Sequence, residues 1–163
     1  MADGLMLDQP PAGRLADGRH LFPIRVYYED TDAGGIVYHA AYLRFAERAR
    51  TEMMRLTGMG HADLQAAHGV TLAVHRASIE YHRPARLDDS VRVASRITAL
   101  SGATITIEQL VERAVDAAVD VDPAARAGFI NLVSLSLRLV TLDRQFRPTR
   151  LPRALRAVIA RYL

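Results

Sequence analysis

The chain has 163 residues, the length of one domain, and half of them are hydrophobic, which is enough for a packed core. The absence of cysteine excludes disulfides, thiolate metal sites and cysteine nucleophiles. The net charge of +3 comes with scattered arginines, no lysine and no dense basic helix, so nucleic acid is not an expected partner. No apolar run reaches the roughly 18 residues of a transmembrane helix, and the N-terminus does not resemble a secretory signal. We therefore expect a cytoplasmic protein.

The N-terminal third of the chain passes from a tail to a strand and then to a turn. Residues 1–20 are rich in Gly, Pro, Ala and Asp without periodicity, which predicts a flexible tail before an ordered domain over 21–163. Residues 21–28 alternate apolar and polar side chains and predict a strand. Acidic residues and two successive glycines then predict a tight turn over residues 29–35.

Residues 40–57 predict the main helix. Its apolar face is formed by residues at helical spacing, namely Tyr42, Phe45, Ala46, Ala49, Met53 and Leu56. Glu47 and Arg50 are predicted on the other side, three residues apart, where they can form a weak ion pair. A shorter helix is predicted over residues 62–67.

The rest of the chain predicts mainly strands. Apolar alternation places them at residues 71–82, 91–99, 103–111 and 133–139. A loop of small residues is predicted at about 114–128. The last segment, 151–163, predicts a short amphipathic helix that packs on the sheet of the same domain rather than on a membrane. One long helix combined with consecutive antiparallel strands indicates an α+β layer design, with the helix on the concave side of the sheet.

The segment most informative about chemistry is residues 25–52. Glu29, Asp30 and Asp32 crowd a turn that leads into the helix, and His39 stands just before it. A helix N-terminus offers free N–H groups and a partial positive charge, which stabilise an oxyanion. A nearby carboxylate can attack a carbonyl or activate water. The spacing therefore suits acyl transfer or hydrolysis, and ordinary turn and capping residues are the alternative interpretation.

Two stretches resemble a known family. The run YYEDTDAGGIVYHAAYLRFAERAR closely resembles the signature of the YbgC-type acyl-CoA thioesterases, within the hydroxybenzoyl-CoA thioesterase group of hotdog proteins. The later run IEYHRPARLDD resembles the second recognisable segment of that family. The resemblance covers about residues 22–155 and implies a hotdog fold, in which a five-stranded antiparallel sheet wraps around a long central helix. It also implies dimers joined edge to edge, often paired into tetramers, with active sites at subunit interfaces.

The same resemblance implies the catalytic residues. Asp32 matches the catalytic carboxylate and is expected to act as nucleophile or as general base. Tyr28 and His39 match residues that line the site and assist the reaction, and the His39 backbone N–H matches the oxyanion donor. The chain departs from the pattern at Ala41, where most relatives carry an asparagine that can cap the helix.

Substrate contacts are predicted on both motifs. Gly35, Val37 and Tyr38 match positions at the substrate. Arg83 and Arg86 are candidates for binding the phosphates of coenzyme A, with solvated charges on an exposed turn as the alternative.

Three further polar residues are predicted to be structural. Other hotdog thioesterases use a carboxylate on the central helix, but Glu47 is predicted to pair with Arg50 at the subunit interface. His75 and His82 lack acidic partners at metal-ligand spacing. No metal and no bound cofactor are expected.

The expected reaction is hydrolysis of acyl-CoA to a free acid and CoA. A substrate on acyl carrier protein stays open, because both substrates share the pantetheine arm. A hotdog dehydratase would instead pair a histidine with a helix carboxylate. YbgC-type proteins are associated with the Tol-Pal cell-envelope system in many Gram-negative bacteria, so a scaffold or binding role there is the second class of function.

Overall fold

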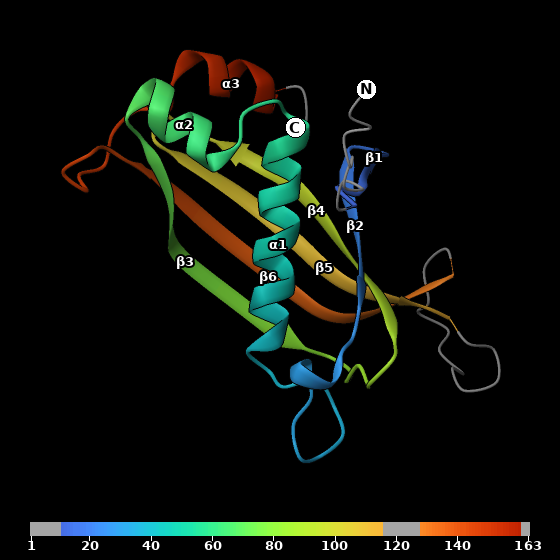
Figure 1. Ribbon diagram of the computed structural model, residues 1–163. Helices are drawn as coiled ribbons and strands as arrows, with labels where there is room; N and C mark the ends of the chain where they lie inside the picture. The colour runs from blue at the N-terminus through green and yellow to red at the C-terminus, as the bar shows by residue number, and fades with distance from the viewer. Residues whose placement is uncertain (1–10, 116–127, 161–163) are drawn as a thin grey trace, which may run out of the picture.

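The computed structural model describes residues 11–115 and 128–160, in which helices pack on one face of an antiparallel sheet (Figure 1). The strands are β1 (Arg14–Ala16), β2 (Arg19–Arg25), β3 (Thr71–Tyr81), β4 (Ser90–Leu100), β5 (Thr104–Ala114) and β6 (Phe129–Leu142). The helices are the 3-10 turn η1 (Tyr28–Asp30) and the α-helices α1 (Ala41–Leu56), α2 (His61–His68) and α3 (Arg153–Ile159). The strand order is β1-β2-β4-β5-β6-β3. The predicted α+β class and long central helix are confirmed.

The described part of the sheet has six strands, one more than predicted. The additional strand, β1, forms a hairpin with β2 through Asp17 and Gly18, whose φ angles of 51° and 69° are left-handed. An Asp-Gly pair favours this two-residue turn. The predicted tail over residues 1–20 therefore contains β1, and the domain boundary predicted at residue 21 falls inside β2. The sequence did not predict this hairpin, because β1 is too short to show an alternation of apolar and polar residues beside the Asp-Gly pair.

His20 on β2 holds the chain that precedes the hairpin. Its ring is buried, its Nε2 is hydrogen-bonded to the Ala12 carbonyl oxygen at 2.8 Å, and its Nδ1 has no hydrogen-bond partner among the described residues. Burial lowers the pKa of His20 below its ordinary value, an effect larger than the opposing influence of the Ala12 carbonyl and the Glu52 charge. The ring is therefore neutral at pH 7.

We expect His20 to make the folding free energy depend on pH. Its pKa is lower in the folded than in the unfolded chain, so the unfolded chain binds the proton first. Stability is then lost as the pH falls from the unfolded value of 6.5 through the folded pKa. The His20→Phe variant lacks this contribution. The free energy of unfolding of the wild type minus that of the variant, measured in urea, should decrease as the pH is lowered from about 7.5 to about 5. An unchanged difference would contradict the prediction.

The predicted strands and helices are confirmed, with shifts at their ends. The strand predicted at 133–139 begins earlier, at Phe129, and the C-terminal helix packs on the domain as expected through Leu155 and Ile159. Most of the loop predicted at 114–128 lies outside the described residues, as do residues 161–163. No helix in the described ranges is long and apolar enough to cross a membrane.

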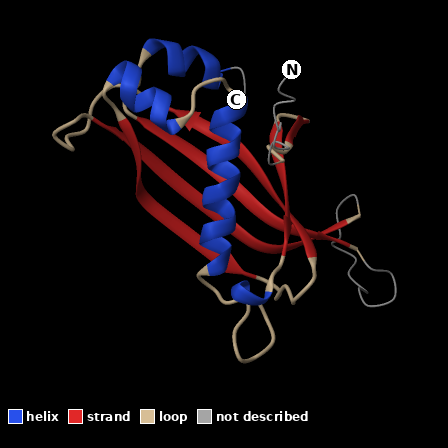
Figure 2. Cartoon of the chain, viewed as in Figure 1, coloured by secondary structure: helices blue, strands red, loops and turns tan. Residues whose placement is uncertain are grey.

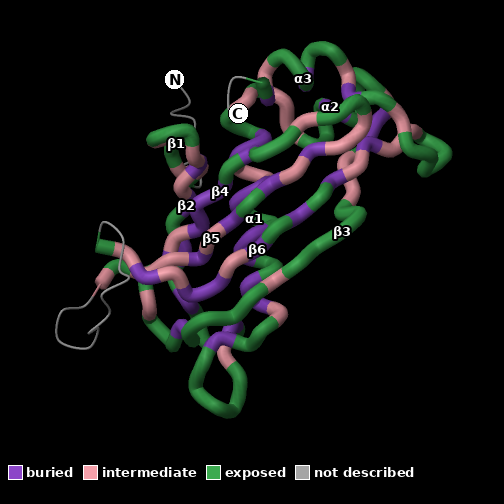
Figure 3. The backbone as a smooth tube through the Cα atoms, turned by 180° about the vertical axis from the view of Figure 1, so that it is seen from behind, coloured by how far each residue is buried: buried purple, intermediate pink, exposed green. Residues whose placement is uncertain are grey.

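Helix α1 lies across the sheet and packs over β2, β4 and β5 (Figure 2). Five of the six residues predicted for its apolar face are buried: Tyr42, Phe45, Ala46, Ala49 and Met53. The prediction for Leu56 was wrong, because the last turn of the helix leaves this side chain exposed. Buried residues follow the middle of the sheet, whereas the edge strand β3 is largely exposed (Figure 3).

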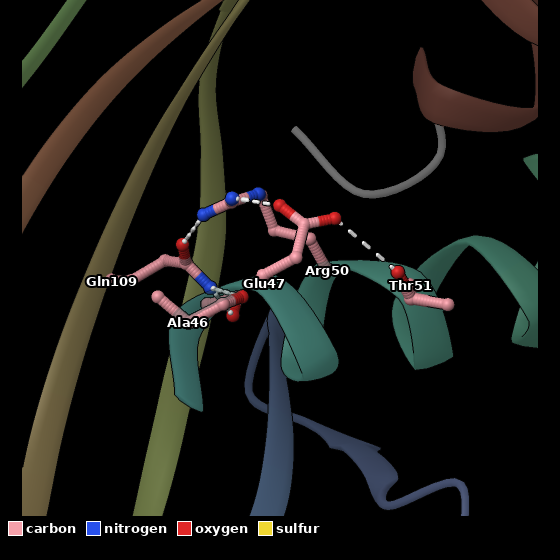
Figure 4. Close-up of polar contacts among 6 residues, drawn as sticks. Ala46, Glu47, Arg50, Thr51 and Gln109 are labelled. Carbon is pink, nitrogen blue, oxygen red and sulfur yellow. Dashed lines mark hydrogen bonds and ion pairs between the residues drawn. The ribbon is translucent and has the colours of Figure 1, made fainter. Parts of the chain in front are cut away.

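Arg50 is the main departure from the predicted helix pattern. Its side chain is only 8% exposed, its Nη1 donates to Gln109 Oε1 at 2.7 Å, and its Nη2 pairs with Glu47 (Figure 4). Gln109 is fully buried, and its Nε2 donates to the Ala46 carbonyl at 3.0 Å and to Ser95 Oγ at 2.9 Å. These two bonds fix Oε1 toward the guanidinium. The predicted ion pair is confirmed, but the outward placement of Arg50 was wrong because its charge is compensated inside the fold.

Candidate active site

The loop between η1 and α1 holds the Asp32 carboxylate in a tight turn. Asp32 Oδ1 accepts a hydrogen bond from the Gly34 N–H at 2.8 Å, and the Gly35 N–H donates to the Asp32 carbonyl at 3.0 Å. Gly35 has a φ of 74°, which glycine adopts without steric cost. The Asp32 N–H in turn donates to the Ile36 carbonyl at 3.0 Å. The carboxylate is therefore oriented by backbone groups of its own loop.

A cleft of about 340 Å³ opens beside this loop. Its walls come from the loop, from the start of α1 and from the segment that follows β3, and they consist of Asp32, Ile36, Val37, His39, Tyr42, Tyr81, His82, Arg83 and Pro84. Four of the predicted site residues thus lie around one cleft: Asp32, Val37, His39 and Arg83. The sequence places them in two separate motifs, and the fold joins the motifs.

His39, which lines the cleft just before α1, offers a backbone donor there. His39 lies just before the N-cap residue Ala40, and no side chain caps the helix. Within residues 11–115 and 128–160, no acceptor is hydrogen-bonded to the His39 N–H. The His39 carbonyl, in the next peptide unit, accepts a hydrogen bond from Tyr81 Oη at 3.1 Å, which anchors the His39 backbone from the other wall of the cleft. Such a site can stabilise a developing oxyanion.

The other predicted site residues do not line the cleft. Tyr28 lies in η1 with 83% of its surface exposed. Gly35 shapes the Asp32 turn. Tyr38 is exposed, and its ring packs on the His39 ring with centroids 4.3 Å apart. Arg86 is exposed too, although its backbone forms an isolated bridge to the loop.

Five residues that line the cleft were not predicted as site residues: Ile36, Tyr42, Tyr81, His82 and Pro84. Tyr81 and His82 directly precede Arg83, a predicted substrate contact, in the second motif. This adjacency is the feature of the sequence that could have identified them as site residues. His82, predicted to be structural, lines the cleft with its Nε2 2.9 Å from Ser134 Oγ. Tyr42 was assigned to the helix core because its spacing fits the apolar face. Glu47 does not line the cleft and pairs with Arg50, as predicted.

Comparisons with known proteins agree with this arrangement. A model of the thioesterase-like superfamily matches residues 26–159. The acyl-CoA thioester hydrolase YbgC of Escherichia coli O6:H1 is 46% identical over 93 residues, which cover 57% of this chain and 69% of that protein. The acyl-CoA thioesterase YbgC of Haemophilus influenzae is 44% identical over 99 residues, which cover 61% and 73%.

A solved structure shows the same fold. The probable thioesterase from Bartonella henselae matches with a TM-score of 0.70 and 32% identity, covering 82% of this chain and 99% of that one. The family match spans every residue that lines the cleft. The chain therefore belongs to the thioesterase-like superfamily of hotdog proteins and, within it, to the YbgC family.

Proposed function

We propose that this protein hydrolyses acyl-CoA thioesters to a free carboxylic acid and CoA, with Asp32 as the catalytic carboxylate. The observation that carries the proposal is the cleft in which Asp32, His39 and the start of α1 lie together. Its relatives from Escherichia coli and Haemophilus influenzae bear the names acyl-CoA thioester hydrolase and acyl-CoA thioesterase.

Two routes use this geometry. In the first, an Asp32 oxygen attacks the thioester carbonyl, the C–S bond breaks, and water hydrolyses the resulting anhydride. In the second, Asp32 removes a proton from water, the hydroxide adds to the carbonyl, and the thiolate leaves as the intermediate collapses. In both routes, the His39 N–H and the helix dipole stabilise the oxyanion. The His39 ring orients water or protonates the thiolate.

Arg83 is the proposed contact to the nucleotide phosphates of CoA, because it lies at the cleft whereas Arg86 does not. Thiol release should be measured on CoA esters from short to long chains, on an aromatic one, and on matching pantetheine esters, which lack those phosphates. Arg83→Met should raise KM about tenfold for CoA esters, leave kcat unchanged, and leave pantetheine esters unaffected.

The outcomes of this assay separate the candidate functions. Hydrolysis restricted to acyl carrier protein substrates would replace the CoA assignment. Absence of hydrolysis with every thioester would refute the enzyme proposal and favour a binding or scaffold role in the Tol-Pal setting. We also propose the cytoplasmic location that the composition predicts.

The free edge of β3 is the proposed subunit contact. Among the described residues, β3 pairs only with β6, and its outer edge carries unpaired backbone groups over 11 residues. Exposed Val74 and Tyr81 accompany this edge. A long uncovered edge strand readily pairs with another chain. We therefore propose a dimer through β3, or a tetramer of such dimers, and mass measurement in solution tests it. A monomer at assay concentration would contradict this assembly.

Gly34→Ala should lower kcat about tenfold or more. A Cβ at this position would lie 3.0 Å from Asp32 Oδ1, so the carboxylate must move from the position that the Gly34 N–H now holds. Kinetics with the CoA ester that reacts fastest would measure the effect. Gly102→Ala is the control, because a Cβ there meets no atom within 4 Å. Equal activity of the two variants would contradict the role of this turn.

A further inference from the structure

We propose that Tyr42 is a positioning residue of the thioester site, which sets the first turn of α1 against the opposite wall of the cleft. This inference rests on the proposed function. Tyr42 is only 2% exposed, and its Oη accepts a hydrogen bond from the Ala85 N–H at 2.9 Å. Ala85 is fully buried and follows Arg83 and Pro84, which line the cleft. The phenol therefore joins α1 to the second motif.

Ala85 also holds the catalytic loop through its carbonyl group. The Ala85 carbonyl accepts a hydrogen bond from the Val37 N–H at 2.9 Å, and Val37 forms a bridge with Thr31, next to Asp32. The hydrogen bonds from the Ala85 N–H to Tyr42 Oη and from the Val37 N–H to the Ala85 carbonyl thus connect the start of α1 with the Asp32 loop. The separation between the carboxylate and the His39 N–H depends on this connection.

Tyr42 also supports the wall that holds the oxyanion donor. Its ring lies 5.9 Å from the Tyr81 ring and 5.8 Å from the Phe45 ring, each in an edge-on arrangement. Tyr81 donates to the His39 carbonyl, so the ring of Tyr42 packs behind the residue that anchors the His39 backbone. The Asp32 carboxylate and the His39 N–H, the two groups proposed to act on the thioester, are consequently positioned by contacts that converge on Tyr42.

The phenol acts as a neutral acceptor. Burial raises the pKa of Tyr42, more than the Ala85 N–H lowers it, so the hydroxyl stays protonated at neutral pH. In Tyr42→Phe the ring contacts remain, but the buried Ala85 N–H loses its acceptor. The 83–86 segment must then move toward another acceptor, and the geometry of the cleft changes with it. A residue that served the core alone would tolerate this substitution without a kinetic effect.

The test compares thiol-release kinetics of wild type, Tyr42→Phe and Ile159→Val well below their unfolding temperatures. Tyr42→Phe should lower kcat about ten- to a hundredfold, as a misplaced catalytic group does, while KM changes less than about twofold. KM stays nearly constant because the long Arg83 side chain can follow a small shift of its turn. Ile159 is the last residue of α3, is buried in the same apolar cluster as Met53 and Leu64, and does not line the cleft. Ile159→Val should therefore lose some stability and keep the wild-type kcat.

Amide exchange provides a second measurement that needs no activity. The Ala85 amide should be protected in wild type and exchange at least about tenfold faster in Tyr42→Phe. An unprotected Ala85 amide in wild type, or a wild-type kcat in Tyr42→Phe, would overturn the proposal. If wild type released no thiol from any ester, the proposed function would fail, and the exchange of Ala85 would still decide whether Tyr42 positions the cleft.

Discussion

Asp32→Asn should reduce kcat for acyl-CoA hydrolysis about a thousandfold or more without unfolding the protein. An amide can neither attack the thioester nor accept a proton from water at neutral pH. Its carbonyl oxygen still accepts a hydrogen bond, so the bond from the Gly34 N–H and the shape of the loop are retained. The loss should therefore appear in the chemical step rather than in folding or assembly.

The matched control is Asp143→Asn. Asp143 Oδ1 accepts a hydrogen bond from the Gln145 N–H at 2.9 Å, the same turn arrangement in a surface loop away from the cleft. This variant should keep wild-type kcat and KM. If Asp32→Asn stayed as active as Asp143→Asn, the catalytic role of Asp32 would be excluded.

Solvent labelled with oxygen-18 separates the two routes in the wild-type enzyme. Label in the Asp32 carboxylate after many turnovers indicates direct attack, because hydrolysis of the anhydride leaves a water oxygen on the protein. Label confined to the product acid in a single turnover favours activation of water by Asp32.

Gln109→Leu should lower the free energy of unfolding by at least about 3 kcal/mol. The substitution removes the acceptor of the buried Arg50 Nη1 and the donor to the buried Ser95 Oγ, whereas the Ala46 carbonyl keeps its hydrogen bond within α1. Each unsatisfied buried group costs about 1–3 kcal/mol. Glu47 cannot compensate, because its side chain is 54% exposed and already pairs with the other guanidinium nitrogen.

A double variant tests the cause of this loss. Arg50→Met combined with Gln109→Leu removes the buried charge together with its partner, so it should be more stable than Gln109→Leu alone. Gln145→Leu makes the same chemical change on an exposed turn and should change stability by less than about 0.5 kcal/mol. Urea denaturation measures all of these variants. A double variant less stable than Gln109→Leu would show that the unsatisfied Arg50 Nη1 is not the cause.

The amino-acid pattern alone determined most of the secondary structure, because burial on one face imposes a period on the sequence. Alternation over residues 103–111 predicts one face made of Ala103, Ile105, Ile107, Gln109 and Val111, and all but the half-buried Ala103 are buried, including the polar Gln109. Helical spacing likewise identified most of the buried face of α1. The two-glycine turn and the resemblance of its motif located Asp32 and His39, because a short loop must use residues with special backbone freedom.

Only the tertiary structure decided where polar groups far apart in the sequence meet. Arg50 is buried because Gln109, 59 positions later, supplies an acceptor, and no local pattern carries that information. The cleft similarly depends on Tyr81, whose hydroxyl reaches the His39 carbonyl 42 positions away. Periodicity records which face of an element is shielded from water. Which partner compensates a buried charge or anchors the His39 carbonyl depends on the strand order, which brings β5 and the end of β3 beside α1.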